Sequence, residues 1–217
     1  MNSKELIARR VAKEFKNGDV VNLGAGLPGM VVNYIPNDIT IYLHAENGIV
    51  GFGSDDPSLP RDIFRTEAAE NRVSIIPGGA IVDSCTGFGI VRGGHLTATV
   101  LGTMQVDQEG SIANWMVPGG KFAGMGGAMD LVVGAKRVIV ATEHCSKDGK
   151  SKILKKCTFP LTGYKVVKTI VTELAYIDVT EEGLILKEVA PGVTVKEVIQ
   201  KTDADLIVSP DVCEMKL

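Results

Sequence analysis

The sequence predicts one α/β domain over residues 1–217, with a mostly parallel sheet flanked by helices. Its length of 217 residues suits a single large domain. Short runs of apolar and β-branched residues alternate with segments of helical periodicity, which is typical of α/β proteins. Between residues 20 and 43, a strand, a glycine turn, a helix and a second strand follow one another. This order indicates a βαβ unit, in which parallel strands are joined by a right-handed crossover.

The first elements follow from apolar spacing and from prolines and glycines. A helix is expected between Ser3 and Gly18, because its apolar residues repeat every four positions. A buried strand is expected at 20–23. A second helix opens at Pro28, which suits a first helical position, and runs to about Tyr34. The next strand is expected at 39–43.

The rest of the chain is richer in strands. They are expected at 73–76, 96–101, 104–106, 112–117, 137–141, 170–171, 175–179, 184–189 and 206–208. Residues 107–110 have the composition of a hairpin turn. Two more helices are expected, at 127–133 and from about Thr194. The lysine-rich stretch from Lys147 to Lys156 is expected to be a solvated loop.

Composition and charge exclude several classes of partner. A net charge of -3 argues against a nucleic-acid or anionic-membrane surface. No apolar run approaches the roughly 20 residues that span a bilayer, and residues 1–16 lack the apolar core of a signal peptide. Cys85, Cys145, Cys157 and Cys213 lie far apart without a CxxC pair, so we expect neither a metal site nor a disulfide. We therefore expect a cytoplasmic protein.

Glycines are frequent and clustered. The chain has 25 glycines, against a usual share of roughly 7%. The clusters lie at 24–29, 48–53, 78–79, 93–94 and 119–127. Each cluster is either a tight turn or a place where the backbone approaches a ligand closely. Five such places in one domain suggest a large ligand followed by backbone amides.

The sharpest single feature is Glu46, at the end of an apolar strand and directly before the turn at Gly48. In open parallel sheets, ligands bind at the carboxyl ends of the strands. A carboxylate that is desolvated there without a partner suits a nucleophile or a general base. The alternative is a Glu that caps a nearby helix. His44 alternates to the opposite face of the strand, and we expect it to be a satisfied structural histidine.

Two glycine loops can present backbone amides to a bound group. The loop Gly24-Ala25-Gly26 resembles a dinucleotide-binding loop only superficially, because Pro28 sits inside it and no acidic residue other than Glu46 follows the second strand to bind a ribose. Its amides, ahead of a helix, can still stabilise an oxyanion or a phosphate. Residues 124–130 form either an oxyanion hole or a tight loop at a helix start. The sequence shows no serine elbow, zinc-protease, Walker or Cys–His motif, which leaves carboxylate chemistry as the best catalytic option.

Three motifs together resemble those of one enzyme family. They are AENGIVG at 45–51, RGGH at 92–95 followed by VLGTMQVDQEGSIANWMVPG at 100–119, and GMGGAMDLV at 124–132. The chain resembles the B subunit of 3-oxoacid CoA-transferases, a family that includes the acetoacetate/butyrate type and the C-terminal half of succinyl-CoA:3-oxoacid CoA-transferase. The later segments KILKKCTFPLTG and IVTELAYIDV resemble it too, so the resemblance covers essentially the full chain.

The resemblance implies roles for residues of this sequence. Glu46 is the nucleophile, and Gly127 lends its backbone N–H to an oxyanion hole. The acyl and CoA groups are expected to lie against Gly24, Ala25, Gly26, Asn47, Gly48 and Gly126. CoA is then a substrate, with no tightly bound cofactor and no metal. The implied partner is the family's A-type subunit, in a heterotetramer of two A-type and two B-type subunits.

The resemblance also implies a reaction. CoA passes between a short-chain acyl-CoA and a carboxylic acid of the acetoacetate or butyrate class, as in fatty-acid or ketone-body metabolism. The route is ping-pong, through a glutamyl-CoA thioester on Glu46. Two interpretations remain as alternatives: an acyl-CoA hydrolase on the same scaffold, which would admit water to the thioester, and a ligand-sensing module without turnover.

Three departures from the family pattern lie near the expected acyl site. Ala45 stands where the family usually has Ser, Glu67-Ala68-Ala69 aligns with its Asn-Ala-Gly, and the segment from Arg61 to Arg72 is unusually charged. We hypothesise that Glu67 meets a polar or cationic substituent of the acyl chain, such as an amino group. The alternative is a solvated loop charge.

Overall fold

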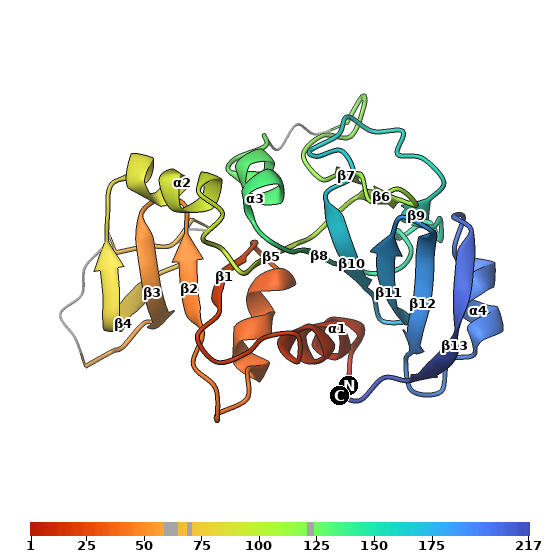
Figure 1. Cartoon of the computed structure of the whole chain (residues 1–217), viewed down its shortest axis with the longest axis horizontal. Helices are drawn as coiled ribbons and strands as arrows, with labels where there is room; N and C mark the ends of the chain where they lie inside the picture. Colours follow the sequence, from red (N-terminus) through yellow and green to blue (C-terminus); the bar gives the residue numbers. More distant parts are fainter. Residues whose placement is uncertain (59–64, 69–70, 121–123) are drawn as a thin grey trace.

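A ten-stranded sheet forms the body of the protein (Figure 1). The computed structural model describes residues 1–58, 65–68, 71–120 and 124–217. The strands of this sheet are β1 (Val20–Leu23), β2 (Tyr42–Ala45), β3 (Ile49–Ser54), β4 (Val73–Ile81), β5 (Ala98–Leu101), β8 (Val138–Ala141), β10 (Val167–Val171), β11 (Ala175–Thr180), β12 (Gly183–Val189) and β13 (Leu206–Glu214). A small second sheet contains β6 (Gln105–Asp107), β7 (Ile112–Ala113) and β9 (Ile153–Leu154). The helices are α1 (Ser3–Ala12), the 3₁₀ helix η1 (Pro28–Tyr34), α2 (Ser84–Arg92), α3 (Ala128–Gly134) and α4 (Val195–Lys201).

The centre of the large sheet is parallel and its two wings contain the antiparallel pairs. The order is β13-β12-β11-β10-β8-β5-β1-β2-β3-β4. From β10 to β2 every neighbouring pair is parallel. Antiparallel pairs join β3 to β2 and β4, and β11 to β10 and β12. The predicted mostly parallel sheet is therefore confirmed, and the predicted βαβ unit is the parallel pair β1–β2 with η1 between them.

Both faces of the sheet are covered, because successive side chains of a strand point to opposite faces. In β8, Val138 and Val140 pack into a core with residues of α2, α3 and the small sheet. Ile139 and Ala141 pack into the opposite core, with residues of α1 and η1. Figure 1 shows α2 and α3 next to each other, at the edge of the sheet where β1, β2 and β5 have their carboxyl ends.

Element boundaries show where the sequence pattern was sufficient. The strand predicted at 20–23 and the helix predicted from Pro28 to Tyr34 have those bounds, although the helix is 3₁₀. The strand expected at 39–43 instead occupies Tyr42–Ala45, so Glu46 follows it directly. The prediction of a solvated loop over 147–156 was wrong in part, because β9 lies within it and its Ile153 is buried. Sequence reasoning did not find β3 or α2.

Each of the two edge strands contains a proline that limits pairing with a further strand. Pro77 lies in β4 and Pro210 lies in β13, which are the first and last strands of the sheet. At each proline the ladder to the neighbouring strand is interrupted by a register shift. A proline has no N–H to donate and is found mainly on edge strands or at bulges.

A buried histidine joins the loop after β8 to the end of α4. The His144 ring is fully buried and contacts the hydroxyls of Thr172, at 3.0 Å from Nδ1, and Thr202, at 2.9 Å from Nε2. Burial, assisted by the charge of Lys201, lowers the pKa of His144 from 6.5 to about 4. The ring is therefore neutral at pH 7.

Candidate active site

The site is built around the turn that joins β2 to β3. Glu46 directly follows the last residue of β2, and the Gly48 N–H donates to the Ala45 carbonyl at 3.0 Å, which closes the turn. Gly48 has a φ of +122°, and a methyl group there would collide with the Val82 carbonyl. Only glycine can meet both conditions. The turn therefore fixes Glu46, half-buried, at the edge formed by the carboxyl ends of the parallel strands.

The Glu46 carboxylate has a partner that sequence reasoning missed. Asn22, from the neighbouring strand β1, is buried and donates from Nδ2 to Glu46 Oε2 at 3.1 Å and to the His44 carbonyl at 3.1 Å. Its Oδ1 accepts a hydrogen bond from Thr99 on β5, also at 3.1 Å. The expectation that Glu46 lacks a partner was therefore wrong. An Asn inside the apolar run Val20 to Leu23 was the available signal, because a buried amide needs hydrogen-bond partners.

Gly127, the residue before α3, lies against the other oxygen of the carboxylate. A methyl group added at Gly127 would lie 2.7 Å from Glu46 Oε1 and 3.0 Å from Cδ. The N–H groups of Gly126 and Gly127 donate to no acceptor within the described part of the chain. Residues 127 and 46, far apart in the sequence, thus meet as the motifs implied.

A cavity of about 410 Å³ opens onto this carboxylate. Among its lining residues are six of the predicted site residues: Glu46, Gly127, Gly24, Ala25, Gly126 and Glu67. Gly26 lines an adjoining cavity of about 550 Å³, which shares Gly24, Ala25 and Glu67 with the first. The arrangement offers a held carboxylate, backbone amides and room for an acyl group, which suits acyl transfer.

Two predicted residues lie outside both cavities. The Asn47 side chain donates to the Thr66 carbonyl at 2.8 Å, and Gly48 is buried against residues 82–83. Neither is among the residues that line the two cavities. Both contribute to the shape of the turn, and the substrate contacts expected of them stay a prediction.

Glu67 lines both cavities, but its carboxylate is engaged locally. Its Oε1 accepts hydrogen bonds from the Asn71 backbone N–H at 2.9 Å and from Asn71 Nδ2 at 2.6 Å. This favours the interpretation as a loop charge that shapes the cavity wall. Contact with an amino group of the substrate stays a prediction. Ala69 and Arg61, the other departures named from the sequence in this region, lie outside the described residues.

His44 is buried, but only one of its two ring nitrogens has a hydrogen-bond partner among the described residues, so the expected satisfied histidine is found only in part. Nε2 lies 3.1 Å from the Gly87 carbonyl of α2, whereas Nδ1 has no hydrogen-bond partner among the described residues. Burial lowers the pKa of His44, and the nearby Glu46 charge opposes this only in part. The histidine also belongs to the wall of the 410 Å³ cavity.

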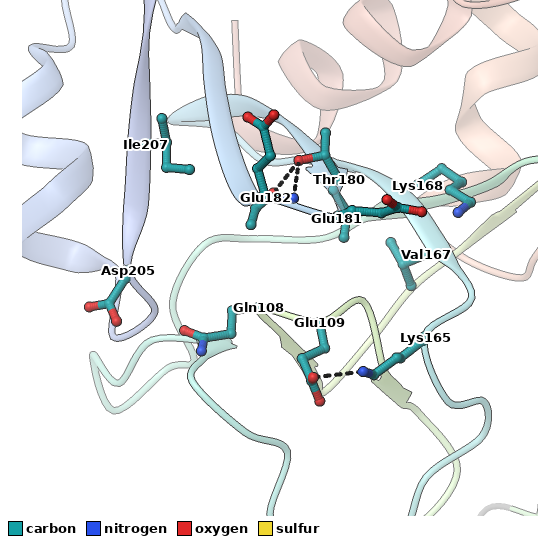
Figure 2. A pocket seen from close by; sticks show the side chains of 12 residues that line it. Gln108, Glu109, Lys165, Val167, Lys168, Thr180, Glu181, Glu182, Asp205 and Ile207 are labelled. Carbon is teal, nitrogen blue, oxygen red and sulfur yellow. Dashed lines mark hydrogen bonds and ion pairs between the residues drawn. The ribbon is translucent and has the colours of Figure 1, made fainter.

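A larger cavity, of about 720 Å³, is lined by other parts of the chain (Figure 2). It lies between the turn after β6, the start of β10 and the turn between β11 and β12. Its side chains carry both charges, and Glu109 pairs with Lys165 at 2.7 Å. It shares no residue with the two cavities near Glu46. We take the 410 Å³ cavity as the candidate active site, because that one joins a held carboxylate to open backbone amides.

Among the described residues, no three His, Cys, Asp or Glu side chains are grouped so that they could hold a metal ion. The helices in that part of the chain are also too short or too polar to cross a membrane.

Known proteins similar to this chain are found along its whole length. Residues 4–201 match the family described as Coenzyme A transferase. The chain is 52% identical over 217 residues to the acetate CoA-transferase subunit beta of Haemophilus influenzae, covering 100% of this chain and 97% of that protein. It is 48% identical over 211 residues to the Escherichia coli protein of the same name, covering 97% and 96%. An acyl-CoA transferase apoenzyme from Escherichia coli O157:H7 has the same fold, with a TM-score of 0.80 at 24% identity; the match covers 99% of this chain and 43% of that one.

Proposed function

The chain belongs to the coenzyme A transferase family, and we propose that it is the glutamate-bearing subunit, passing CoA from an acyl-CoA to a carboxylic acid through Glu46. One observation carries the proposal: the Glu46 carboxylate is held between Asn22 and Gly127 at the wall of a cavity. A carboxylate held in this way can attack a thioester as a nucleophile, which is the role that fits the family.

The proposed reaction has four covalent steps. A Glu46 oxygen attacks the thioester carbonyl, the C–S bond breaks, and a glutamyl–acyl anhydride and CoA thiolate form. The thiolate attacks the glutamyl carbonyl, which releases the first carboxylate and leaves CoA on Glu46 as a thioester. A second carboxylate attacks that thioester and forms a new anhydride with release of thiolate. The thiolate then attacks the new acyl carbonyl, giving the new acyl-CoA and free Glu46.

Each step passes through a tetrahedral intermediate that carries a negative oxygen. The Asn22 amide already donates to Glu46 Oε2, and Gly127, whose backbone N–H has no acceptor among the described residues, lies against Oε1. We assign stabilisation of the intermediates to these two donors. Loss of one such donor commonly raises the barrier by about 3 kcal/mol.

The substrates and the partner follow from the family and from the names of the relatives. Two relatives are named acetate CoA-transferase, so acetate joins acetoacetate and butyrate as a proposed acid. The same names contain the word subunit, which supports the presence of a partner chain; the A-type partner and the A₂B₂ assembly are proposed from the family resemblance. The four cysteines are free thiols, which suits the proposed cytoplasmic location.

The proposal is tested on the complex of this chain with its A-type partner, incubated with acetyl-CoA. Mass spectrometry of the digested complex should find CoA on the peptide that contains Glu46, and borohydride should convert that residue to an alcohol. Glu46→Gln should lose the adduct and lower CoA exchange by at least about 10⁴-fold, because an amide is a poor nucleophile.

Glu109→Gln, at the separate large cavity, serves as the control and should keep both adduct and exchange. Full activity in Glu46→Gln would overturn the proposal. Loss of acetyl-CoA without any carboxylate acceptor would favour the hydrolase alternative instead.

A further inference from the structure

The His44 ring has a single tautomer that fits its surroundings. Its Nε2 lies 3.1 Å from the Gly87 carbonyl, and a carbonyl oxygen can only accept. Nε2 therefore carries the proton and donates. Nδ1, buried and without a partner among the described residues, is left as a bare acceptor. The ring is 1% exposed, so water does not compete for the bond to Gly87.

That bond attaches α2 to β2, the strand that Glu46 directly follows. Further contacts join the same two parts. The Val82 N–H donates to the Gly48 carbonyl at 2.9 Å, and a methyl group added at Gly87 would lie 2.8 Å from the Glu46 carbonyl. The start of α2 thus packs directly against the backbone of the turn that carries the nucleophile.

The far end of α2 is fixed to α3. Arg92 donates to Asp130 at 2.7 Å, and a methyl group added at Gly134 would collide with the Val91 carbonyl. Helix α3 begins directly after Gly127, which lies against the Glu46 side chain. Contacts therefore run in a closed ring, from the turn through α2 and α3 and back to the carboxylate.

We propose that His44 is a positioning residue for Glu46, whose Nε2–H bond to Gly87 sets the distance between the nucleophile turn and the helix pair α2–α3. The inference rests on the proposed function, because it assigns His44 a part in that reaction. Because only 1% of its surface is exposed, we assign His44 a role through Glu46 rather than through contact with the substrate. It acts by keeping the Glu46 carboxylate in register with the N–H of Gly127, and an error of about 1 Å in such a placement can cost roughly 100-fold in rate.

Two variants separate positioning from packing. His44→Leu keeps the approximate volume and removes the donor, whereas His44→Gln can place an N–H₂ near the position of Nε2. In the complex with the A-type partner, His44→Leu should slow formation of the glutamyl-CoA thioester by about 10- to 100-fold, with KM for acetyl-CoA changed less than about 3-fold. His44→Gln should recover most of the rate.

His144→Leu is the matched control, because His144 is an equally buried histidine that lines neither cavity near Glu46. It should lower stability and leave the rate of thioester formation unchanged. Equal rates in wild type and His44→Leu would overturn the inference, and so would equal losses in His44→Leu and His44→Gln.

A measurement on the wild-type complex does not depend on how the variants fold. Imidazole ¹⁵N shifts at pH 7.5 should show His44 as the neutral Nε2–H tautomer; a cationic ring or an Nδ1–H tautomer would contradict the inference. Failure of the proposed function looks different, because the wild type itself would then form no adduct on Glu46.

Discussion

Asn22 is the residue through which the interior of the sheet holds the reacting carboxylate. It uses both amide hydrogens, on Glu46 and on the His44 carbonyl, and its oxygen accepts from Thr99. A fully satisfied buried amide keeps one orientation, because any rotation would leave polar atoms unpaired. Asn22 therefore presents a donor, rather than an acceptor, to Glu46.

Asn22→Asp should test this arrangement at almost unchanged volume. The new carboxylate would face Glu46 at hydrogen-bond distance, and the two negative charges would repel. We expect CoA exchange to fall by at least about 100-fold, which is the usual cost of losing one such donor. Steady-state kinetics of the assembled complex measure the effect.

Thr99→Val is the milder comparison, because it removes only the hydrogen bond to Asn22 Oδ1. It should cost less than about 10-fold, as expected for a neutral hydrogen bond worth about 1 kcal/mol. An Asn22→Asp enzyme with wild-type exchange would show that the amide has no part in the reaction.

For single residues, the sequence predicted where Glu46 lies in the fold but not which residues contact it. Glu46 could be placed at a sheet edge because it follows an apolar run and precedes a glycine turn. Its contact with Asn22 depends on the parallel register of β1 and β2, in which Val21 pairs with Leu43. No local pattern encodes that register. The pairing with Gly127 was expected only through family resemblance, since 81 residues separate the two positions.

Among the helices and strands, α2 is one that the sequence pattern did not predict. Gly87 and Gly89 lie within it, and glycine in a helix interior costs about 1 kcal/mol relative to alanine. The helix forms because Asp83 caps its first turn by accepting from the Thr86 N–H at 3.0 Å, and because its buried face packs on the turn at Glu46. Tertiary contact outweighs local propensity here.

The two glycines of α2 should respond differently to alanine. A methyl group at Gly87 would lie 2.8 Å from the Glu46 carbonyl, so the turn must move. We expect Gly87→Ala to destabilise the fold by about 1–3 kcal/mol and to slow CoA exchange by about 10- to 100-fold. Thermal unfolding and exchange rates report the two effects.

Gly89→Ala is the matched control in the same helix, because nothing lies within 4 Å of the added methyl group. It should leave exchange unchanged and stabilise the helix by about 0.5–1 kcal/mol. Similar behaviour of the two variants would mean that α2 does not press on the nucleophile turn.

Strand β9 shows another limit of pattern reading. Its two residues, Ile153 and Leu154, are surrounded by lysines, so the local composition is that of a solvated loop. The strand exists because Ile153 fills the core beneath the small sheet and pairs with Val106. Long-range packing of this kind leaves little trace in a short window of sequence.

For the molecule as a whole, the fold class could be predicted because a strand, a glycine turn, a helix and a second strand follow one another between residues 20 and 43, which indicates a βαβ unit. The wings were harder to foresee: strand runs alone do not tell a parallel from an antiparallel neighbour. The stability of the assembled fold also depends on His144, which ties the loop after β8 to the end of α4.

Acid should destabilise the fold through His144. Its pKa is about 4 in the folded state, against an ordinary value of 6.5. The unfolded chain binds the proton more readily than the folded protein does. The contribution of the neutral His144 ring to the free energy of unfolding is therefore complete above pH 6.5 and is lost as pH falls towards 4. The difference corresponds to about 3 kcal/mol.

Urea unfolding of wild type and His144→Gln at pH 7 and pH 4 isolates this group. The stability advantage of the wild type should shrink by about 3 kcal/mol at the lower pH, since glutamine does not titrate. A constant advantage across that range would show that the ring is not held neutral.

The prolines of the edge strands also matter for how the protein behaves in a crowded solution. A sheet with two open ends offers two places where another copy could add a strand and begin a fibrous aggregate. Pro77 and Pro210 interrupt both ends, since neither residue has an N–H with which to extend a ladder. Substitution of Pro77 and Pro210 by valine would leave the nucleophile unchanged. It would also leave both edge strands able to pair with another copy, so the protein would tend to precipitate on concentration.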